Sequence, residues 1–146
     1  MTEPGELERR IRVLEDIEAI KKLKASYFRC LDKKLWQELG ECLARDALGE
    51  KESKLQGKEA IVEYIKGRLG KESIVTAHHG HNPEIELTGE TTARGTWQLR
   101  SYRTDTETNE DSGHMSFYQD EYVKENGKWR IKSTVCIGIA TNVCER

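Results

Sequence analysis

The spacing of apolar residues changes once along this chain, from three and four residues in the first half to two in the second. In the first half the apolar side chains fall mostly on one stripe of a helix. They are Leu7, Ile11, Leu14, Ile17, Ile20, Leu23, Tyr27, Phe28 and Leu31. This pattern predicts a long helix from about Glu6 to Leu31, a short helix near Lys34 to Leu43, and a third helix that opens at Gly57 and ends by Gly70.

Beyond the third helix alternate residues share a face, as they do in strands. Ile74, Thr76 and His78 form one such face. The segment Glu125-Asn126-Gly127-Lys128 predicts a hairpin turn, because Asn-Gly favours positive φ. The last strand is predicted to place six residues on one face: Trp129, Ile131, Ser133, Val135, Ile137 and Ile139.

Three helices followed by an antiparallel meander predict an α+β fold in which helices pack on a sheet. A strongly curved sheet wrapped around the long helix would leave a pocket between them, which is a natural small-molecule site.

The composition excludes several classes of partner. The 146 residues hold 24 Lys and Arg against 26 Asp and Glu, so bulk charge attracts neither nucleic acid nor an anionic membrane. No apolar run approaches the roughly 20 residues that span a bilayer. The polar, acidic start is unlike a secretory signal, so we expect one cytoplasmic domain over residues 1–146. Widely spaced cysteines without a CxxC pair favour buried free thiols: Cys30, Cys42, Cys136 and Cys144.

The segment from Asp16 to Asp32 carries the most specific signal. It resembles the first helix of SnoaL-like (scytalone-dehydratase-like) proteins of the nuclear transport factor 2-like superfamily, and is especially similar to that of bile-acid 7-alpha-dehydratases. In that family a Tyr and an Asp five residues apart line the cavity, and Tyr27 and Asp32 match this spacing. The resemblance implies three N-terminal helices on an antiparallel or mixed sheet that forms a cone-shaped half-barrel with an internal pocket. From the residues alone, Asp32 could equally be the N-cap of a helix that begins at Lys33.

A second segment, from Ala77 to Ile85, contains three histidines. The SnoaL-like dehydratases and the related hexachlorocyclohexane dehydrochlorinase carry a catalytic His on a strand, two residues before a Gly, as His78 stands before Gly80. His79 and His81 alternate to the other face. A metal site there is disfavoured, because an imidazole site needs three or four converging ligands and no matching pair stands elsewhere.

The predicted chemistry is a proton transfer that needs no metal or organic cofactor. A neutral imidazole at His78 can take a proton from carbon that a carbonyl group activates. A carboxylate at Asp32 would fix the tautomer and stabilise the imidazolium, and Tyr27 would hydrogen-bond the developing enolate oxygen. The resemblance therefore implies a lyase that eliminates water or another leaving group.

The sequence departs from the bile-acid dehydratases at two places. Ser101 stands where they carry a second Asp, and a hydroxyl cannot replace a carboxyl as proton donor at neutral pH. The stretch Leu48 to Glu52 contains no Tyr, where they carry one. His114 is a candidate for the acid that would replace this Asp. The plainer interpretation is that His114 is a surface residue near a loop. The residues predicted to contact a ligand are Trp97, Ser101, His114 and Tyr118.

Three functions are compatible with these features. The first is a dehydratase-like lyase that acts on a small hydrophobic, polycyclic or aromatic-like hydroxylated compound. The second is a non-catalytic small-molecule-binding protein, which the missing second Asp favours. The third is a structural subunit whose cavity is filled by side chains. The resemblance also implies a homo-oligomer formed through the outer face of the sheet, with a trimer favoured over a dimer.

Overall fold

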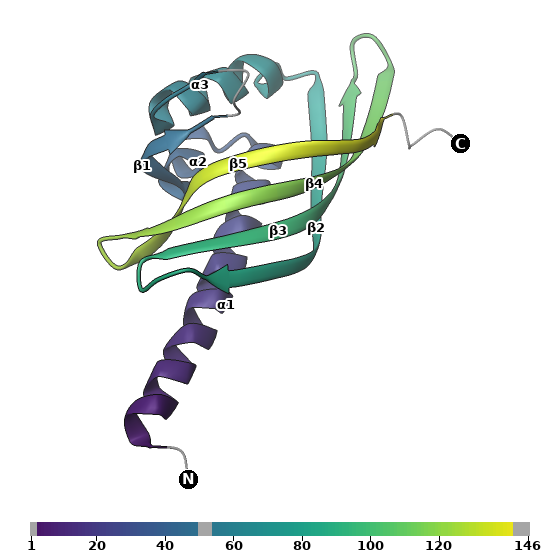
Figure 1. Ribbon diagram of the computed structural model, residues 1–146. Coiled ribbons are helices and arrows are strands. Elements are labelled where there is room, and N and C mark those ends of the chain that lie inside the picture. Colours follow the sequence, from purple (N-terminus) through teal and green to yellow (C-terminus); the bar gives the residue numbers. More distant parts are fainter. Residues whose placement is uncertain (1–2, 50–53, 142–146) are drawn as a thin grey trace.

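The computed structural model describes residues 3–49 and 54–141. Three helices lie against one five-stranded sheet, and α1 runs beneath its concave face (Figure 1). The α+β class with helices packed on a curved, mixed sheet is thereby confirmed, and the sheet is open. In chain order the elements are α1 (Pro4–Lys33), α2 (Trp36–Cys42), β1 (Leu43–Leu48), α3 (Lys58–Leu69), β2 (Ile74–Leu87), β3 (Thr92–Asp105), β4 (Glu110–Glu125) and β5 (Lys128–Thr141).

Helix α1 has a solvated half and a buried half. Residues 3–15 are exposed, and this part of the helix projects beyond the sheet in Figure 1. Burial begins at Asp16, whose Oδ1 accepts hydrogen bonds from Trp129 Nε1 at 2.8 Å and Lys124 Nζ at 3.1 Å. The helix ends where Lys34 adopts a left-handed φ of 59°, which ties its backbone N–H to the last turn. The second half of α1 therefore supplies the side chains that face the sheet.

The sheet has the strand order β1-β5-β4-β3-β2. Strands β2 to β5 form an antiparallel meander, and β1 pairs with β5 in parallel. The predicted hairpin between β4 and β5 is confirmed, with φ values of 50° at Asn126 and 78° at Gly127. The sequence pattern did not reveal β1, because its six residues do not alternate regularly between buried and exposed.

The predicted single face of β5 is wrong beyond Ile131. In the register with β4, Tyr122 pairs with Ile131 and Glu121 pairs with Ser133, so Lys132 is an extra residue in a β-bulge. One inserted residue exchanges the two faces of a strand. Ile137 is consequently about half exposed, at 48%, and Thr134 and Cys136 lie on the inner face instead. Ile139, 56% exposed, is the extra residue of a second bulge, because Met115 pairs with Ala140 and Ser116 pairs with Gly138.

The described cysteines and helices bear on two further sequence expectations. Cys30 and Cys42 are buried free thiols and Cys136 is a half-buried one, whereas Cys144 lies outside the described residues. Within residues 3–49 and 54–141, no helix has the length and apolar character needed to cross a membrane.

Candidate active site

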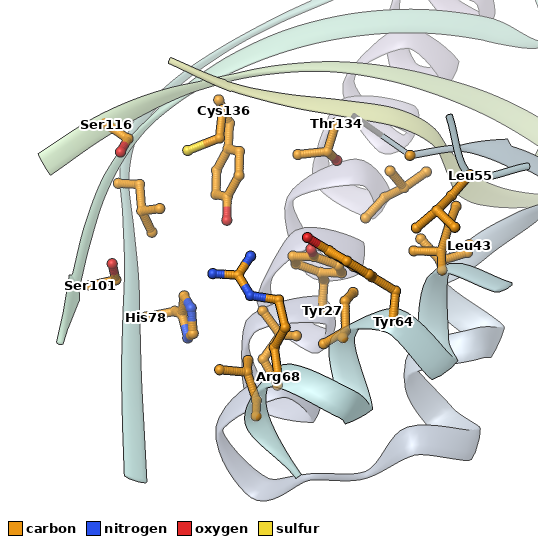
Figure 2. A pocket seen from close by; sticks show the side chains of 18 of the residues that line it. Tyr27, Leu43, Leu55, Tyr64, Arg68, His78, Ser101, Ser116, Thr134 and Cys136 are labelled. Atoms are coloured by element: carbon orange, nitrogen blue, oxygen red, sulfur yellow. The ribbon is translucent and has the colours of Figure 1, made fainter. Parts of the chain in front are cut away.

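A cavity of about 320 Å³ lies between α1, α3 and the inner face of the sheet. Figure 2 shows side chains entering it from both helices and from the strands. Its wall is apolar toward β1 and becomes polar toward β2 and β3. The lining residues are Tyr27, Leu31, Leu43, Leu48, Gly49, Leu55, Ile61, Tyr64, Ile65, Arg68, Leu69, His78, Leu99, Ser101, His114, Ser116, Tyr118, Ile131, Thr134 and Cys136.

His78 and Asp32 form a hydrogen-bonded pair at the polar end of this cavity. His78 Nδ1 lies 2.6 Å from Asp32 Oδ1, and the His78 backbone N–H donates to Asp32 Oδ2 at 3.0 Å. Thr76 Oγ1 donates to Asp32 Oδ1 at 2.9 Å. Both oxygens of the carboxylate are thus held by β2, and the pair is largely buried, with 13% of the His78 side chain and 27% of the Asp32 side chain exposed.

This geometry fixes the protonation of the neutral imidazole. A carboxylate only accepts hydrogen bonds, so the proton of a neutral His78 belongs on Nδ1 and the lone pair on Nε2. Burial favours the neutral form of Asp32, but the hydrogen bonds from His78 and Thr76 outweigh it and hold the pKa of the carboxyl below its ordinary value. Asp32 does not cap α2, whose N-cap is Leu35.

Phe28 and Asp32 hold His78 from the same helix face. They are four residues apart, so both project from one side of α1. The Phe28 ring stacks on the imidazole with an interplanar angle of 8° and a centroid distance of 6.2 Å. His78 is therefore fixed by a ring on one face and a carboxylate at one edge, which leaves few orientations open to it.

The register of the sheet sets three polar residues in one row across its inner face. His78 pairs with Ser101 of β3, and Ser101 pairs with His114 of β4. Residues directly opposite each other in an antiparallel pair project to the same face. The cavity wall accordingly presents two imidazoles separated by one strand, with the Ser101 hydroxyl between them.

A buried ammonium group lies beneath two of the tyrosines that line the cavity, Tyr27 and Tyr118. Lys24 Nζ is 2.7 Å from Asp120 Oδ2, with both side chains fully buried. It lies 3.9 Å from the ring centroid of Tyr118 and 4.8 Å from that of Tyr27. Burial lowers the pKa of Lys24, and the nearby Asp120 carboxylate opposes this shift. The rings of Tyr27 and Tyr118 are therefore held from below by a cation.

A family model for the SnoaL-like domain matches residues 12–135. The chain belongs to the SnoaL-like domain family. The match covers α1 from its third turn onward, α3 and most of the sheet, including both His78 and Asp32.

Solved structures with the same fold include a candidate scytalone dehydratase and two hexachlorocyclohexane dehydrochlorinases. A candidate scytalone dehydratase from Novosphingobium aromaticivorans DSM 12444 has a TM-score of 0.84 and 23% identity, covering 94% of this chain and 93% of its own. A type 2 hexachlorocyclohexane dehydrochlorinase has a TM-score of 0.81 and 19% identity, covering 90% of each chain. A type 3 dehydrochlorinase from Novosphingobium barchaimii LL02 has a TM-score of 0.76 and 18% identity, covering 90% and 94%. At these identities the likeness shows a shared fold.

In this SnoaL-like domain the predicted ligand contacts divide into two groups. Ser101, His114 and Tyr118 line the cavity, and their contact with a ligand stays a prediction. Ser101 and Tyr118 are buried, whereas His114 is exposed, as the plainer interpretation of a surface histidine expected. Trp97 does not line it, so the prediction of Trp97 as a ligand contact is corrected. Its indole N–H donates to the Tyr122 hydroxyl at 3.0 Å inside the core. Trp97 does face inward, but α1 packs over that part of the sheet.

Tyr64 and Arg68 are among the cavity residues that the sequence pattern did not predict. Tyr64 and Arg68 project into the cavity from α3, as Figure 2 shows. They flank the apolar stripe of Ile61, Ile65 and Leu69, so one face of the predicted helix already carried them. Neither belongs to a motif, and only the packing of α3 over the open end of the sheet directs them inward.

The three histidines of β2 also separate as alternation predicts. His79 and His81 pack edge to face with each other, and His79 packs in the same way against Tyr102 on the outer side of the sheet. Among the residues that the structure describes, no group of three or more His, Cys, Asp or Glu side chains is placed to hold a metal ion.

Proposed function

We propose that this protein is a cofactor-independent lyase that eliminates water, or a comparable leaving group, from a small hydrophobic hydroxylated compound. The observation that carries this proposal is the 2.6 Å contact between His78 Nδ1 and Asp32 Oδ1 at the wall of a largely apolar cavity. Membership of the SnoaL-like family and the shared fold of dehydratase and dehydrochlorinase structures support the same reaction class.

In the proposed reaction His78 is the general base. Its Nε2 takes a proton from the carbon next to a carbonyl group, and the electron pair of that C–H bond moves toward the carbonyl oxygen. Asp32 stabilises the imidazolium that forms, because its carboxylate stays hydrogen-bonded to Nδ1–H. The Tyr27 hydroxyl donates to the enolate oxygen.

His114 is the proposed proton donor to the leaving group. As the enolate collapses, a C=C bond forms and the C–O bond to the hydroxyl breaks, and His114 in its protonated form supplies the proton that makes water. The row of His78, Ser101 and His114 supports this role, because it sets acid and base on one wall with a strand between them. His78 then releases its proton to solvent and His114 takes one up from solvent, so both imidazoles are restored and the substrate has lost one molecule of water.

Turnover of a simple bicyclic β-hydroxy ketone tests the proposal. 3-Hydroxy-1-tetralone loses water to give 1-naphthol, whose fluorescence reports the product. We expect His78→Gln and Asp32→Asn to lower kcat/KM by at least about 100-fold, the lower range for general acid–base catalysis. His81→Gln is the matched control, because His81 lies on the outer face, and it should keep wild-type activity. Equal turnover by His78→Gln and wild type would contradict the proposal that His78 is the general base.

A second candidate is a small-molecule-binding protein without catalysis. The observation that favours it is Ser101, since no Asp or Glu stands among the described residues that line the cavity. This alternative predicts that a bound β-hydroxy ketone exchanges none of its α-protons in D₂O and that His78→Gln binds it as wild type does. Exchange catalysed by wild type and lost in His78→Gln would exclude it. The similarity of α1 to bile-acid 7-alpha-dehydratases does not narrow the substrate, because Ser101 cannot act as their acid.

We also propose a homo-oligomer that buries the outer face of the sheet. Val75, Phe117 and Ile137 are 56%, 39% and 48% exposed, and the last two are paired across β4 and β5. Exposed apolar residues gathered on one face are typical of interaction surfaces. Light scattering on wild type should give a trimer or a dimer, and Phe117→Lys should lower the mass; a monomeric wild type would contradict the proposal.

A further inference from the structure

The cavity opens into a second recess of about 180 Å³ that shares its lining with the polar end of the first. Tyr64, Arg68, His78, Ser101 and His114 contribute to both, and the recess adds a second arginine, Arg103. Of the described residues that line these two spaces, Arg68 and Arg103 carry permanent positive charge, and none is an Asp or Glu. Among the described residues, two permanent positive charges therefore line these spaces, against one carboxylate, Asp32, which lies behind His78 and is hydrogen-bonded to it.

Arg68 lines both spaces although the residue as a whole is exposed, and it has no carboxylate partner among the described residues. It comes from the last turn of α3, and its guanidinium group points into the cavity in Figure 2. Tyr64, one helical turn earlier, places its ring centroid 5.8 Å from the Arg68 Cζ, which orients the side chain. In residues 3–49 and 54–141, no Asp or Glu comes within ion-pair distance of Arg68.

Arg94 shows the hydrogen bonds that an arginine of this chain makes when a carboxylate is within reach. On the outer face Arg94 donates through Nε and Nη2 to Glu86 Oε2, at 3.0 and 2.8 Å. The Asp32 carboxylate, which belongs to the same site, already accepts three hydrogen bonds from Thr76 and His78 and forms no ion pair with Arg68. The negative end of α3 explains why a basic residue suits this turn. It does not explain a guanidinium fork directed into a cavity.

We propose that the substrate is an organic acid, with an apolar ring system in the cavity and one carboxylate that binds the Arg68 guanidinium. This inference rests on the proposed function for the reaction and adds the charge of the substrate. A guanidinium presents parallel N–H donors that match the two oxygens of a carboxylate. Arg103 raises the positive potential at the mouth, and the apolar wall formed by Leu31, Ile61 and Leu99 receives the rings.

Binding of two matched compounds to the full-length protein tests this proposal. 2-Naphthoate and 2-naphthamide have the same rings and nearly the same shape, and differ in charge. By calorimetry at low ionic strength we expect 2-naphthoate to bind at least about tenfold more tightly. Arg68→Gln should abolish that preference and Arg68→Lys should retain part of it, because an ammonium keeps the charge without the fork. Lys66→Gln removes a charge from the same helical turn outside both spaces and should keep the full preference.

Equal affinity for the two compounds, a preference that survives in Arg68→Gln, or no binding of either compound at millimolar concentration would overturn the proposal. Failure here is distinguishable from failure of the proposed function, because the readout is binding and not turnover. His78→Gln should lose elimination and still prefer 2-naphthoate. If the wild type eliminates water from 3-hydroxy-1-tetralone but binds 2-naphthoate and 2-naphthamide equally, the proposed lyase function stands and the proposal of an organic-acid substrate fails.

Discussion

Gly80 lies so close to Phe28 that a Cβ atom at residue 80 would come within 2.4 Å of the Phe28 Cε2. The absent side chain gives room to the ring that stacks on His78. A glycine two residues after the histidine is thus needed because α1 and β2 approach each other closely at this point, and not because of its backbone angles.

Gly80→Ala should therefore disturb both stability and the site. The added methyl group must push the Phe28 ring aside, and overpacking of this kind costs about 1–3 kcal/mol. We expect the free energy of unfolding in urea to fall by that amount and elimination activity to fall with it, because the imidazole loses its stacking partner. Gly138→Ala is the matched strand control, since a Cβ there meets nothing within 4 Å, and it should change stability by less than about 0.5 kcal/mol. An unchanged stability for Gly80→Ala would show that Phe28 moves freely.

Asp32 should contribute to stability in a pH-dependent way. The pKa of its carboxyl is lowered in the folded protein, so the stabilisation is present above the ordinary value of 3.8 and is lost as pH falls through the lower folded value. Near neutral pH we expect Asp32→Asn to lose about 1–3 kcal/mol, because an amide cannot accept from all three donors. Urea unfolding of both proteins at several pH values should show the difference shrinking below pH 3.8. A difference that grows on acidification would contradict the assignment.

The buried pair of Lys24 and Asp120 should behave as a unit. Removing one partner leaves the other charge buried, so Lys24→Met should cost about 3–5 kcal/mol. The double variant Lys24→Met, Asp120→Asn should cost less than the sum of the single changes, which a double-mutant cycle of urea unfolding measures. The exposed pair of Arg94 and Glu86 is the comparison, and Arg94→Met should cost at most about 1 kcal/mol. Additive costs at Lys24 and Asp120 would mean that the two charges do not interact.

The three described cysteines should react at different rates with iodoacetamide. Burial raises the pKa of Cys42 to about 12 and also raises that of Cys30, which keeps both thiols protonated and shielded. Cys136 is half-buried on the cavity wall and should be alkylated first, and saturating 2-naphthoate should slow its reaction. Fragment-ion mapping of the tryptic peptide separates Cys136 from Cys144, and Cys136→Ser provides the blank. Faster labelling of Cys30 or Cys42 in the native protein would contradict the observed packing.

Much of the fold was accessible from the sequence because it is encoded in local periodicity. The spacing of three and four residues predicted α1 and α3, alternation predicted β2 to β5, and Asn126-Gly127 predicted the last hairpin. Strand β1 was not accessible in this way, because its parallel pairing with β5 is a long-range contact with no local signature. The bulge at Lys132 was missed for a related reason, since an extra residue in one strand is defined only by its partner strand.

For the site, the sequence alone determined which groups can do chemistry: an imidazole at His78, a carboxylate at Asp32 and a phenol at Tyr27. Only the tertiary structure decided which of them meet. Residues 32 and 78 are 46 positions apart, and the 2.6 Å contact between their side chains exists because α1 crosses β2. The same packing took Trp97 out of the cavity, buried Lys24 and turned Arg68 inward. A local sequence pattern gives the direction of a side chain relative to its own element, whereas what it faces depends on the neighbouring element that the fold places there.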